Sequence, residues 1–472
     1  MGSSLGSIPP SPSPSSLTSS TLSSFLNRNH TLGRNPRKPK TNIAKTSSSF
    51  VQRIVTNDQL AKILVARTSE DTNLFYNCGY NFVWMDASCH PKVKATCKQG
   101  FGGVPLNIKG KTLQEPLSRV VFSKAAPTSH DVNLLTRGVD HLDIIIGFTS
   151  GDIIWFDPLC NKYGRINKGN VMNPSAVSMI KWLPGSENLF MAAFKDGSIM
   201  VFDKEKEDEV FHPDDYQGEH GGKREKFVQT YGSKGHVFQV TKSSPKSKCN
   251  PVSHWQVSDK PITAFAFSPD CQHVAVVGLD GTLRIINFVH EQLYDVYQGY
   301  YGGLTCAAWS PDGRYVLVGG QDDLVTIWAF REQRIIARCQ GHSSWVTSVA
   351  FDPWRCDEKL YRFASVGEDA KLILWDFSVN ALHRPKTKAS SRHRGASVSS
   401  TISQAPNILS AVQDRLPTVR PAPAKNEVPF LPPTMVQTVH ADPCTGVYFR
   451  EDVIVTTDKR GRVSIWKRPS TS

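Results

Sequence analysis

The sequence of 472 residues lacks any long run of hydrophobic residues and has no apolar segment near its first residue. A membrane-spanning helix requires about 18 consecutive apolar residues, and a secretory leader requires a shorter apolar core behind a basic start. Neither pattern occurs, since the first 49 residues are mainly serine, threonine, proline and basic residues. We therefore expect a cytoplasmic protein, with the nucleus as a second location, and no membrane partner.

Paired cysteines are also missing. The ten cysteines are scattered without a Cys-x-x-Cys motif, so neither a zinc site nor a disulfide framework is indicated. We expect reduced thiols, no metal and no other cofactor. One alternative stays open at a lower rank, because His212, His220 and His236 lie in one stretch of sequence and histidines can bind a metal.

Acidic residues are nearly absent from two segments, and this absence explains the net charge of +13. Residues 1–49 and residues 378–439 each carry a net charge of +6, so the rest of the chain is almost neutral. A protein that binds nucleic acid through its folded part concentrates basic residues there. We therefore expect no nucleic-acid partner. The basic run 34–40 is interpreted as a solvated tail, with a nuclear-import signal as the alternative.

The clearest positive feature is a pair of repeat units within residues 302–377. Each unit has short alternating apolar runs and a turn that contains aspartate. In the first unit Asp322 precedes Trp328 by six residues, and in the second Asp369 precedes Trp375 by the same spacing. The second unit also begins with a Gly-His pair and ends with Trp-Asp. This pattern is similar to that of WD40 repeats and predicts four-stranded blades of a β-propeller, an all-β fold.

The resemblance to a WD40 repeat implies a buried tetrad of hydrogen-bonded side chains in the second unit. Its members are His342, Ser365, Asp369 and Trp375. Aspartate can bind the histidine, and the serine hydroxyl can bind both the histidine and the indole N–H, so each buried polar group is paired. A Ser-His-Asp hydrolase triad uses three of the same residue types. The structural interpretation is favoured because the spacing is that of a blade.

Repeats of this kind extend over most of the chain. Their closing positions are residues 156, 202, 286, 328, 375 and 466, and two of the intervals are long enough to hold one repeat and an insertion. A strand pair at 73–86 brings the expected number of blades to seven. The N-terminal segment is expected to supply a strand beside the last blade, because pairing removes an exposed sheet edge. Only the repeat ending at Trp375 is expected to contain a complete tetrad.

The expected organisation is therefore a tail followed by one interrupted propeller. Residues 1–49 are predicted to be a disordered basic tail rich in serine and proline, and residues 50–468 to form the propeller. The charged and aromatic insertion 204–259 can be either ordered strands or a loop. The basic, proline-rich insertion 378–438 is predicted to be disordered.

Three stretches carry a more specific resemblance. Residues 300–328 begin Tyr-Tyr-Gly-Gly-Leu-Thr-Cys and end Thr-Ile-Trp, residues 181–190 read Lys-Trp-Leu-Pro-Gly-Ser-Glu-Asn-Leu-Phe, and residues 341–353 begin Gly-His-Ser-Ser-Trp. Together they resemble the family of the fungal catabolite-repression protein CreC. Its animal members are WD-repeat activators of ubiquitin-specific proteases.

This resemblance implies a non-catalytic subunit that binds a ubiquitin-specific protease and raises its activity or stability, in fungi within carbon catabolite regulation. The expected contacts are Tyr301 and Trp345, with Tyr300 beside them; the first two lie 44 residues apart, which is one repeat. No catalytic residue and no small-molecule substrate are expected. The alternative is a generic WD40 scaffold, such as a substrate receptor of a ubiquitin ligase, which would use the same face.

Overall fold

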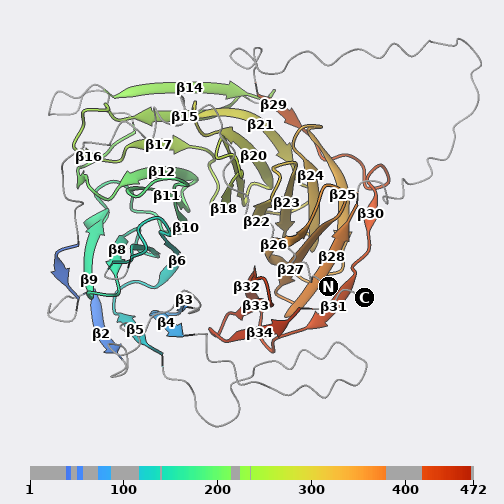
Figure 1. Cartoon of the computed structure of the whole chain (residues 1–472). Coiled ribbons are helices and arrows are strands. Elements are labelled where there is room, and N and C mark those ends of the chain that lie inside the picture. Colours follow the sequence, from blue (N-terminus) through green and yellow to red (C-terminus); the bar gives the residue numbers. More distant parts are fainter. Residues whose placement is uncertain are drawn as a thin grey trace, which may run out of the picture. The chain divides into compact units, whose positions relative to one another are not determined.

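The computed structural model divides into two compact units, residues 1–37 and residues 38–472. It describes residues 39–43, 50–56, 73–86, 116–138, 141–213, 224–233, 235–378 and 417–468, all in the second unit. The described strands of that unit form seven main sheets around a ring (Figure 1). The seven-bladed all-β propeller predicted from the sequence is confirmed.

The first three blades contain the following strands. Blade 1 has β2 (Val51–Thr56), β3 (Asn73–Cys78), β4 (Asn81–Asp86) and β5 (Ser118–Phe122). Blade 2 has β6 (Pro127–Val132), β7 (Ile144–Phe148), β8 (Ile153–Asp157), β9 (Lys162–Ile166) and the short β1 (Thr41–Asn42). Blade 3 has β10 (Val177–Trp182), β11 (Leu189–Phe194), β12 (Ser198–Asp203), β17 (Ser253–Gln256), β15 (His236–Lys242) and β14 (Glu225–Tyr231).

The other four blades complete the ring. Blade 4 has β18 (Ile262–Phe267), β19 (His273–Gly278), β20 (Thr282–Asn287), β21 (Gln292–Gln298) and β29 (Thr418–Arg420). Blade 5 has β22 (Leu304–Trp309), β23 (Tyr315–Gly320), β24 (Leu324–Ala329), β25 (Arg334–Gln340) and β30 (Phe430–Leu431). Blade 6 has β26 (Val346–Cys356), β27 (Tyr361–Gly367), β28 (Lys371–Phe377) and β31 (Met435–Thr438). Blade 7 has β32 (Cys444–Phe449), β33 (Val453–Asp458) and β34 (Val463–Lys467).

Little of the described chain lies outside these blades. A two-stranded parallel sheet joins β13 (Glu207–Asp208) to β16 (Cys249–Asn250). The one helical segment among the described residues is a 3-10 turn at Lys168–Asn170. No helix of the described residues is long and apolar enough to span a membrane.

The position of a strand within its blade explains its residue pattern. The second and third strands are covered on both faces by neighbouring blades, so β11, β12, β8 and β23 are buried at every position. Such strands are continuous hydrophobic runs, as in other sheets that are buried on both faces. The innermost strands β22 and β26 instead mix buried and partly exposed residues.

Six of the seven innermost strands carry an irregularity near their first residue, at which one residue is skipped in the pairing with the second strand. In five of them the skipped residue is threonine, and in three of these the threonine hydroxyl reaches the next blade. The Thr263 hydroxyl donates to the Leu304 carbonyl at 2.7 Å, and the Thr305 hydroxyl donates to the Val346 carbonyl at 2.5 Å. The Thr347 hydroxyl donates to the Cys444 carbonyl at 2.8 Å. These bulges therefore join blades 4 to 5, 5 to 6 and 6 to 7.

The N-terminal strand does not close the ring as predicted. Strand β2 pairs with β5 and completes blade 1, whereas blade 7 has three strands within the described residues. For the described N-terminal strands, the prediction that one lies beside the last blade is therefore wrong. Blade 1 needs this strand because its third strand, β5, is followed almost directly by β6 of blade 2. Blades 7 and 1 still meet, since a Cβ on Gly461 would lie 2.7 Å from the Cys78 side chain.

Both insertions contain ordered strands. Within 204–259, strands β14 and β15 form a hairpin that extends blade 3, and β17 is the fourth strand of that blade. Within 378–438, the predicted disorder is wrong for residues 417–438, which contain β29, β30 and β31. Buried Val428 and Leu431 provide the apolar contact that orders this segment. Residues 379–416 lie outside the described residues.

The predicted disordered tail 1–49 needs one correction. Strand β1 pairs with the outer edge of β9, and Ile43 is buried in the same cluster as Phe50. Edge pairing and one buried side chain order this short stretch, although its composition is that of a tail. The other tail residues, 1–38 and 44–49, lie outside the described residues.

Candidate partner-binding face

Tyr301 and Trp345 lie in equivalent connections of two neighbouring blades. Tyr301 is in the connection from β21 to β22, and Trp345 immediately precedes β26 in the connection from β25. Each connection joins the fourth strand of one blade to the innermost strand of the next blade, so both connections lie on the same face of the ring. The side chain of Tyr301 is 79% exposed and that of Trp345 is 45% exposed. We call this surface the anchor face.

The loop that carries Tyr301 is tied to turns on the same face. Gly303 donates its N–H to the Gln321 side chain at 2.8 Å, and Gln321 returns a backbone hydrogen bond to Gly303. A Cβ on Gly303 would lie 2.7 Å from Leu279 Cδ2, so glycine permits close contact with blade 4. Gly302 has a φ of +67°, which also favours glycine. The backbone after Tyr301 is thus held against two blades.

Leu279 is a member of the anchor face that the sequence does not reveal. It lies in the turn between β19 and β20 of blade 4, it is 42% exposed, and it is beside Gly303. Its sequence context is that of any strand end, and only the packing of blade 5 against blade 4 places it beside the loop that carries Tyr301. The anchor face therefore presents hydrophobic side chains from three consecutive blades, namely Leu279, Tyr301 and Trp345.

Tyr300 has a different environment from Tyr301. It is partly buried, and it packs against a cluster that includes Tyr297, Leu304 and Val428. The ammonium group of Lys425 lies 5.9 Å from the centre of its ring, and burial raises the pKa of its hydroxyl. Of the three residues expected to contact a partner, two are exposed, and Tyr300 supports the loop from below.

The tetrad lies directly beneath the loop of Trp345. His342 Nδ1 is 3.0 Å from Asp369, His342 Nε2 is 2.8 Å from the Ser365 hydroxyl, and the Trp375 indole N–H donates to the same hydroxyl at 2.9 Å. Asp369 also accepts the N–H of Ser343 at 3.0 Å. Burial lowers the pKa of His342, although the Asp369 carboxylate opposes this effect. The tetrad thus connects residues 342 and 343 to the second and third strands of blade 6.

The Ser-His-Asp portion of the tetrad is enclosed. Ser365 is 0% exposed, and its hydroxyl is bonded to both His342 and Trp375. A substrate carbonyl has no path to this oxygen, which favours the structural interpretation over a hydrolase triad. Among the described residues, no group of three or more His, Cys, Asp and Glu residues could hold a metal ion. His212 and His236 are exposed, and His220 lies outside the described residues.

Blade 7 contains a second tetrad that the sequence interpretation missed. His440 Nδ1 is 3.2 Å from Asp458, His440 Nε2 is 2.8 Å from the Thr456 hydroxyl, and Trp466 donates to that hydroxyl at 2.8 Å. The expectation that only the repeat ending at Trp375 is complete is therefore wrong. Arg460 stands in the turn where aspartate is usual, and Asp458 supplies the carboxylate instead. The available signal was Thr456, which precedes its tryptophan by ten residues, as Ser365 does.

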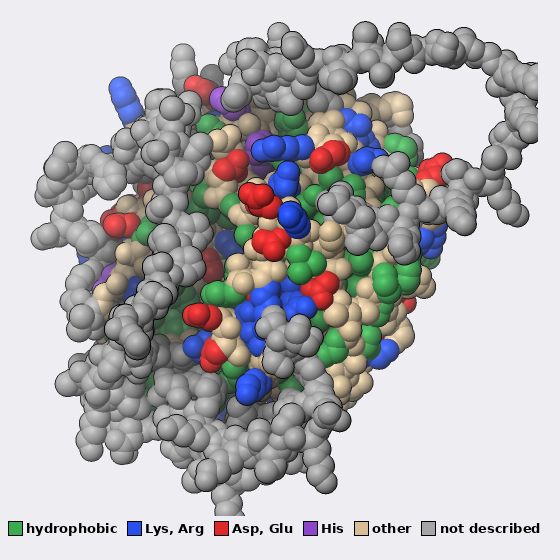
Figure 2. Space-filling view, turned by 45° about the vertical axis from the view of Figure 1, so that its right-hand side comes forward, with side chains coloured by type: hydrophobic (Ala, Val, Ile, Leu, Met, Phe, Trp, Pro, Cys, Tyr) green, Lys and Arg blue, Asp and Glu red, His purple; other side chains and the backbone are tan. Residues whose placement is uncertain are grey.

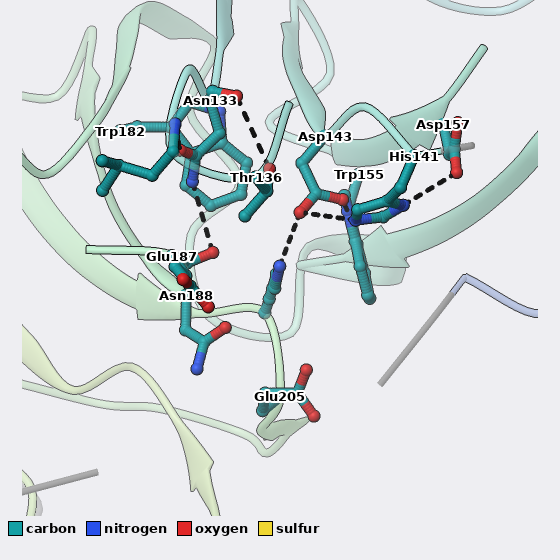
Figure 3. A network of polar contacts seen from close by, with 12 residues as sticks. Asn133, Thr136, His141, Asp143, Trp155, Asp157, Trp182, Glu187, Asn188 and Glu205 are labelled. Carbon is teal, nitrogen blue, oxygen red and sulfur yellow. Dashed lines mark hydrogen bonds and ion pairs between the residues drawn. The ribbon is translucent and has the colours of Figure 1, made fainter. Parts of the chain in front are cut away.

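A buried charged network joins blades 2 and 3 on the opposite face (Figure 3). Asp143, which is 0% exposed, accepts hydrogen bonds from Lys204 at 2.6 Å and from the Trp155 indole at 2.5 Å. His141 bridges Asp143 at 3.1 Å and Asp157 at 3.0 Å. The Lys204 ammonium also lies 5.1 Å from the centre of the Trp155 ring. Asp143 directly precedes β7 of blade 2 and Lys204 directly follows β12 of blade 3, so their buried ion pair links the two blades.

Comparison with known proteins agrees with this architecture. The family model for the WD domain, G-beta repeat, matches residues 248–287, 291–329 and 333–376. A chain in a crystal structure of the mitotic checkpoint complex is similar with a TM-score of 0.50 and 10% identity, over 93% of this chain and 98% of that chain. At this identity the similarity supports the fold alone.

Two curated proteins are similar to this chain over more than half of its length. The UBP9-binding protein bun62 of Schizosaccharomyces pombe is 34% identical over 437 residues, which cover 90% of this chain and 75% of that protein. WD repeat-containing protein 20 of Mus musculus is 29% identical over 336 residues, which cover 60% of this chain and 55% of that protein. The chain therefore belongs to the WD40-repeat family that includes bun62 and WD repeat-containing protein 20.

Proposed function

We propose that this chain is a non-catalytic WD40 adaptor that binds a ubiquitin-specific protease through its anchor face and raises the activity or stability of that protease. The observation that carries the proposal is the pair of exposed aromatic side chains, Tyr301 and Trp345, on one face of adjacent blades. The relationship to a protein named for binding UBP9 supports the class of partner.

The anchor face has the properties of an interface centre. Large aromatic side chains remove much surface from water and lose little conformational entropy when they are fixed. The Trp345 backbone is already held, because its carbonyl accepts the N–H of Glu368 at 2.9 Å and the tetrad lies below it. A preformed loop loses less entropy when a partner binds, and this favours affinity.

Activation by such an adaptor requires a difference in affinity between two states of the protease. An adaptor that binds the active and inactive states equally cannot shift their equilibrium. The proposed role therefore assigns all bond-breaking chemistry to the protease. The anchor face contributes binding free energy that is larger for the competent conformation.

The test is the rate of ubiquitin-substrate hydrolysis by purified UBP9 with increasing amounts of the full chain. Trp345→Ala should raise the concentration needed for half-maximal activation by at least about 30-fold, because central aromatic anchors contribute 2 kcal/mol or more. Trp354→Ala is the matched control, since Trp354 is 50% exposed but lies at the other end of β26. Equal activation by the parent chain and the Trp345→Ala variant would contradict the proposed site, and no effect of the parent chain would contradict the function.

A further inference from the structure

One segment runs along the outside of the blades that carry the anchor face. Residues 417–431, here called the strap, contribute β29 as a parallel partner of β21 and β30 as a parallel partner of β25. Figure 1 shows the two strands in red at the outer edge of the ring. After the strap, the chain supplies β31 as the fourth strand of blade 6.

The strands that the strap joins are those that lead into the anchor loops. Strand β21 ends at Gln298, three residues before Tyr301, and β25 ends at Gln340, five residues before Trp345. In each case the strap is the fifth strand of the blade. A segment that pairs with these two strands therefore constrains both loops from their N-terminal ends.

The first contact of the strap is electrostatic. Arg420 pairs with Tyr297 in the strand register, and its Nε lies 3.9 Å from Asp295, which is 0% exposed. Gln333 donates to Asp295 at 2.8 Å and accepts from Arg420. A buried carboxylate needs such partners, because burial strongly disfavours an unpaired charge. Arg420 thus ties the strap to the outer strand of blade 4 and to the turn that precedes β25 in blade 5.

The second contact is apolar and reaches Tyr300. Val428 is 3% exposed and belongs to the cluster against which Tyr300 packs. Lys425 covers the Tyr300 ring, and its own carbonyl accepts a hydrogen bond from Arg338 Nη2 at 2.7 Å. Tyr300 is therefore enclosed from the outside by the strap while the adjacent Tyr301 projects into solvent.

The third contact reaches the other loop. Leu431 is 8% exposed and lies in the cluster that contains Val346 and Trp375. Val346 follows Trp345 directly, and Trp375 belongs to the tetrad below the loop. Phe430, the neighbour of Leu431 on the same strand, points outward and is 46% exposed. The strap thus contributes one buried side chain to each of the two clusters that contain neighbours of the anchor residues.

We propose that the strap is a positioning element of the partner site. Val428 and Lys425 hold Tyr300 and thereby the conformation of Tyr301, and Leu431 does the same for Trp345. The inference rests on the proposed function and deepens it, because it makes protease affinity depend on residues that do not touch the protease. Docking of the strap and binding of the protease are then coupled, since both require the same arrangement of the two loops.

The experiment measures the affinity of purified UBP9 for full-chain variants together with hydrogen exchange of residues 299–303 and 341–345. Val428→Ala and Leu431→Ala should each weaken binding by about 10-fold, as expected for loss of one well-packed support, and should speed exchange in the nearer loop. Leu431→Met, which keeps an apolar side chain of similar volume, should bind as the parent does, in contrast to Leu431→Ala. Phe430→Ala is the matched control, because it alters the same strand on its outward side, and it should bind as the parent does.

Exposed Lys425→Ala keeps the test decisive even where a buried variant folds poorly. It should weaken binding by about 3-fold, the size of a surface cation–π contact, without a change in thermal stability. Parent-like affinity and loop exchange in Lys425→Ala and in the folded strap variants, with Trp345→Ala still defective, would overturn the strap proposal alone. Absence of UBP9 binding by the parent chain would instead overturn the proposed function on which it rests.

Discussion

At the scale of single residues, several buried histidines remain neutral in the folded chain. Burial lowers the pKa of His254 and of His130 to about 4 in each case. It also lowers the pKa of His342 and His440, where neighbouring aspartates oppose the shift. Since unfolded histidines have a pKa near 6.5, the unfolded chain binds more protons than the folded chain between these values.

Stability should therefore fall as the pH falls from 6.5 towards 4. His254 contributes its full stabilisation above pH 6.5, and between pH 7 and pH 5 the free energy of unfolding should decrease by about 2 kcal/mol for this residue. Urea unfolding at several pH values measures the slope. His254→Gln should flatten that slope, and an unchanged pH dependence in this variant would show that His254 already binds its proton in the folded state.

Lys204 provides a second test at this scale. Lys204→Met removes the cation that pairs with fully buried Asp143, so the free energy of unfolding should fall by about 3 kcal/mol or more. Lys195→Met removes an exposed lysine and should change stability by less than about 0.5 kcal/mol. Equal effects in the two variants would mean that Asp143 is satisfied without Lys204.

At the scale of elements, the threonine bulges explain how blades 4 to 7 are joined in sequence, whether or not a blade has a tetrad. Thr263, Thr305 and Thr347 recur at intervals of 42 residues, and each hydroxyl reaches a carbonyl of the next blade. Residue type and spacing were visible in the sequence. Their meaning was not, because the acceptor is a backbone group of another repeat, which no side-chain pattern marks.

The predicted consequence is a specific need for the hydroxyl group. Thr305→Val keeps the shape of the side chain but leaves the Val346 carbonyl without this donor, so thermal or urea unfolding should show a loss of about 1–2 kcal/mol. Thr305→Ser retains the hydroxyl and should lose less. The bulge would have no such role if the serine variant were the less stable of the two.

The same scale shows what the sequence could and could not predict. Repeats with alternating apolar runs were predicted because β22–β24 and β26–β28 each supply complete strands with tight turns. The strap was missed because β29 and β30 contain three and two paired residues, which is too short for any periodicity. Proline-rich composition pointed to disorder, and only the surfaces of blades 4 and 5 make Val428 and Leu431 buried.

At the scale of the whole molecule, the described part is a ring that presents Tyr301 and Trp345 together on one face. On the side that Figure 2 shows, basic, acidic and hydrophobic side chains are interspersed over the described surface. Under the proposed function, the partner is selected mainly by the shape and apolar contacts of the anchor face rather than by a strong electrostatic field of one sign. The positions of Tyr301 and Trp345 came from the family resemblance, whereas Leu279 and the strap required the packed structure.

The most direct measurement is photo-crosslinking of the complex with UBP9 from single positions of the full chain. A photoreactive residue at 301 or 345 should link to the protease, and one at 354, at the opposite end of β26, should not. Crosslinks from position 354 without any from 301 or 345 would place the protease on the other face and contradict the account.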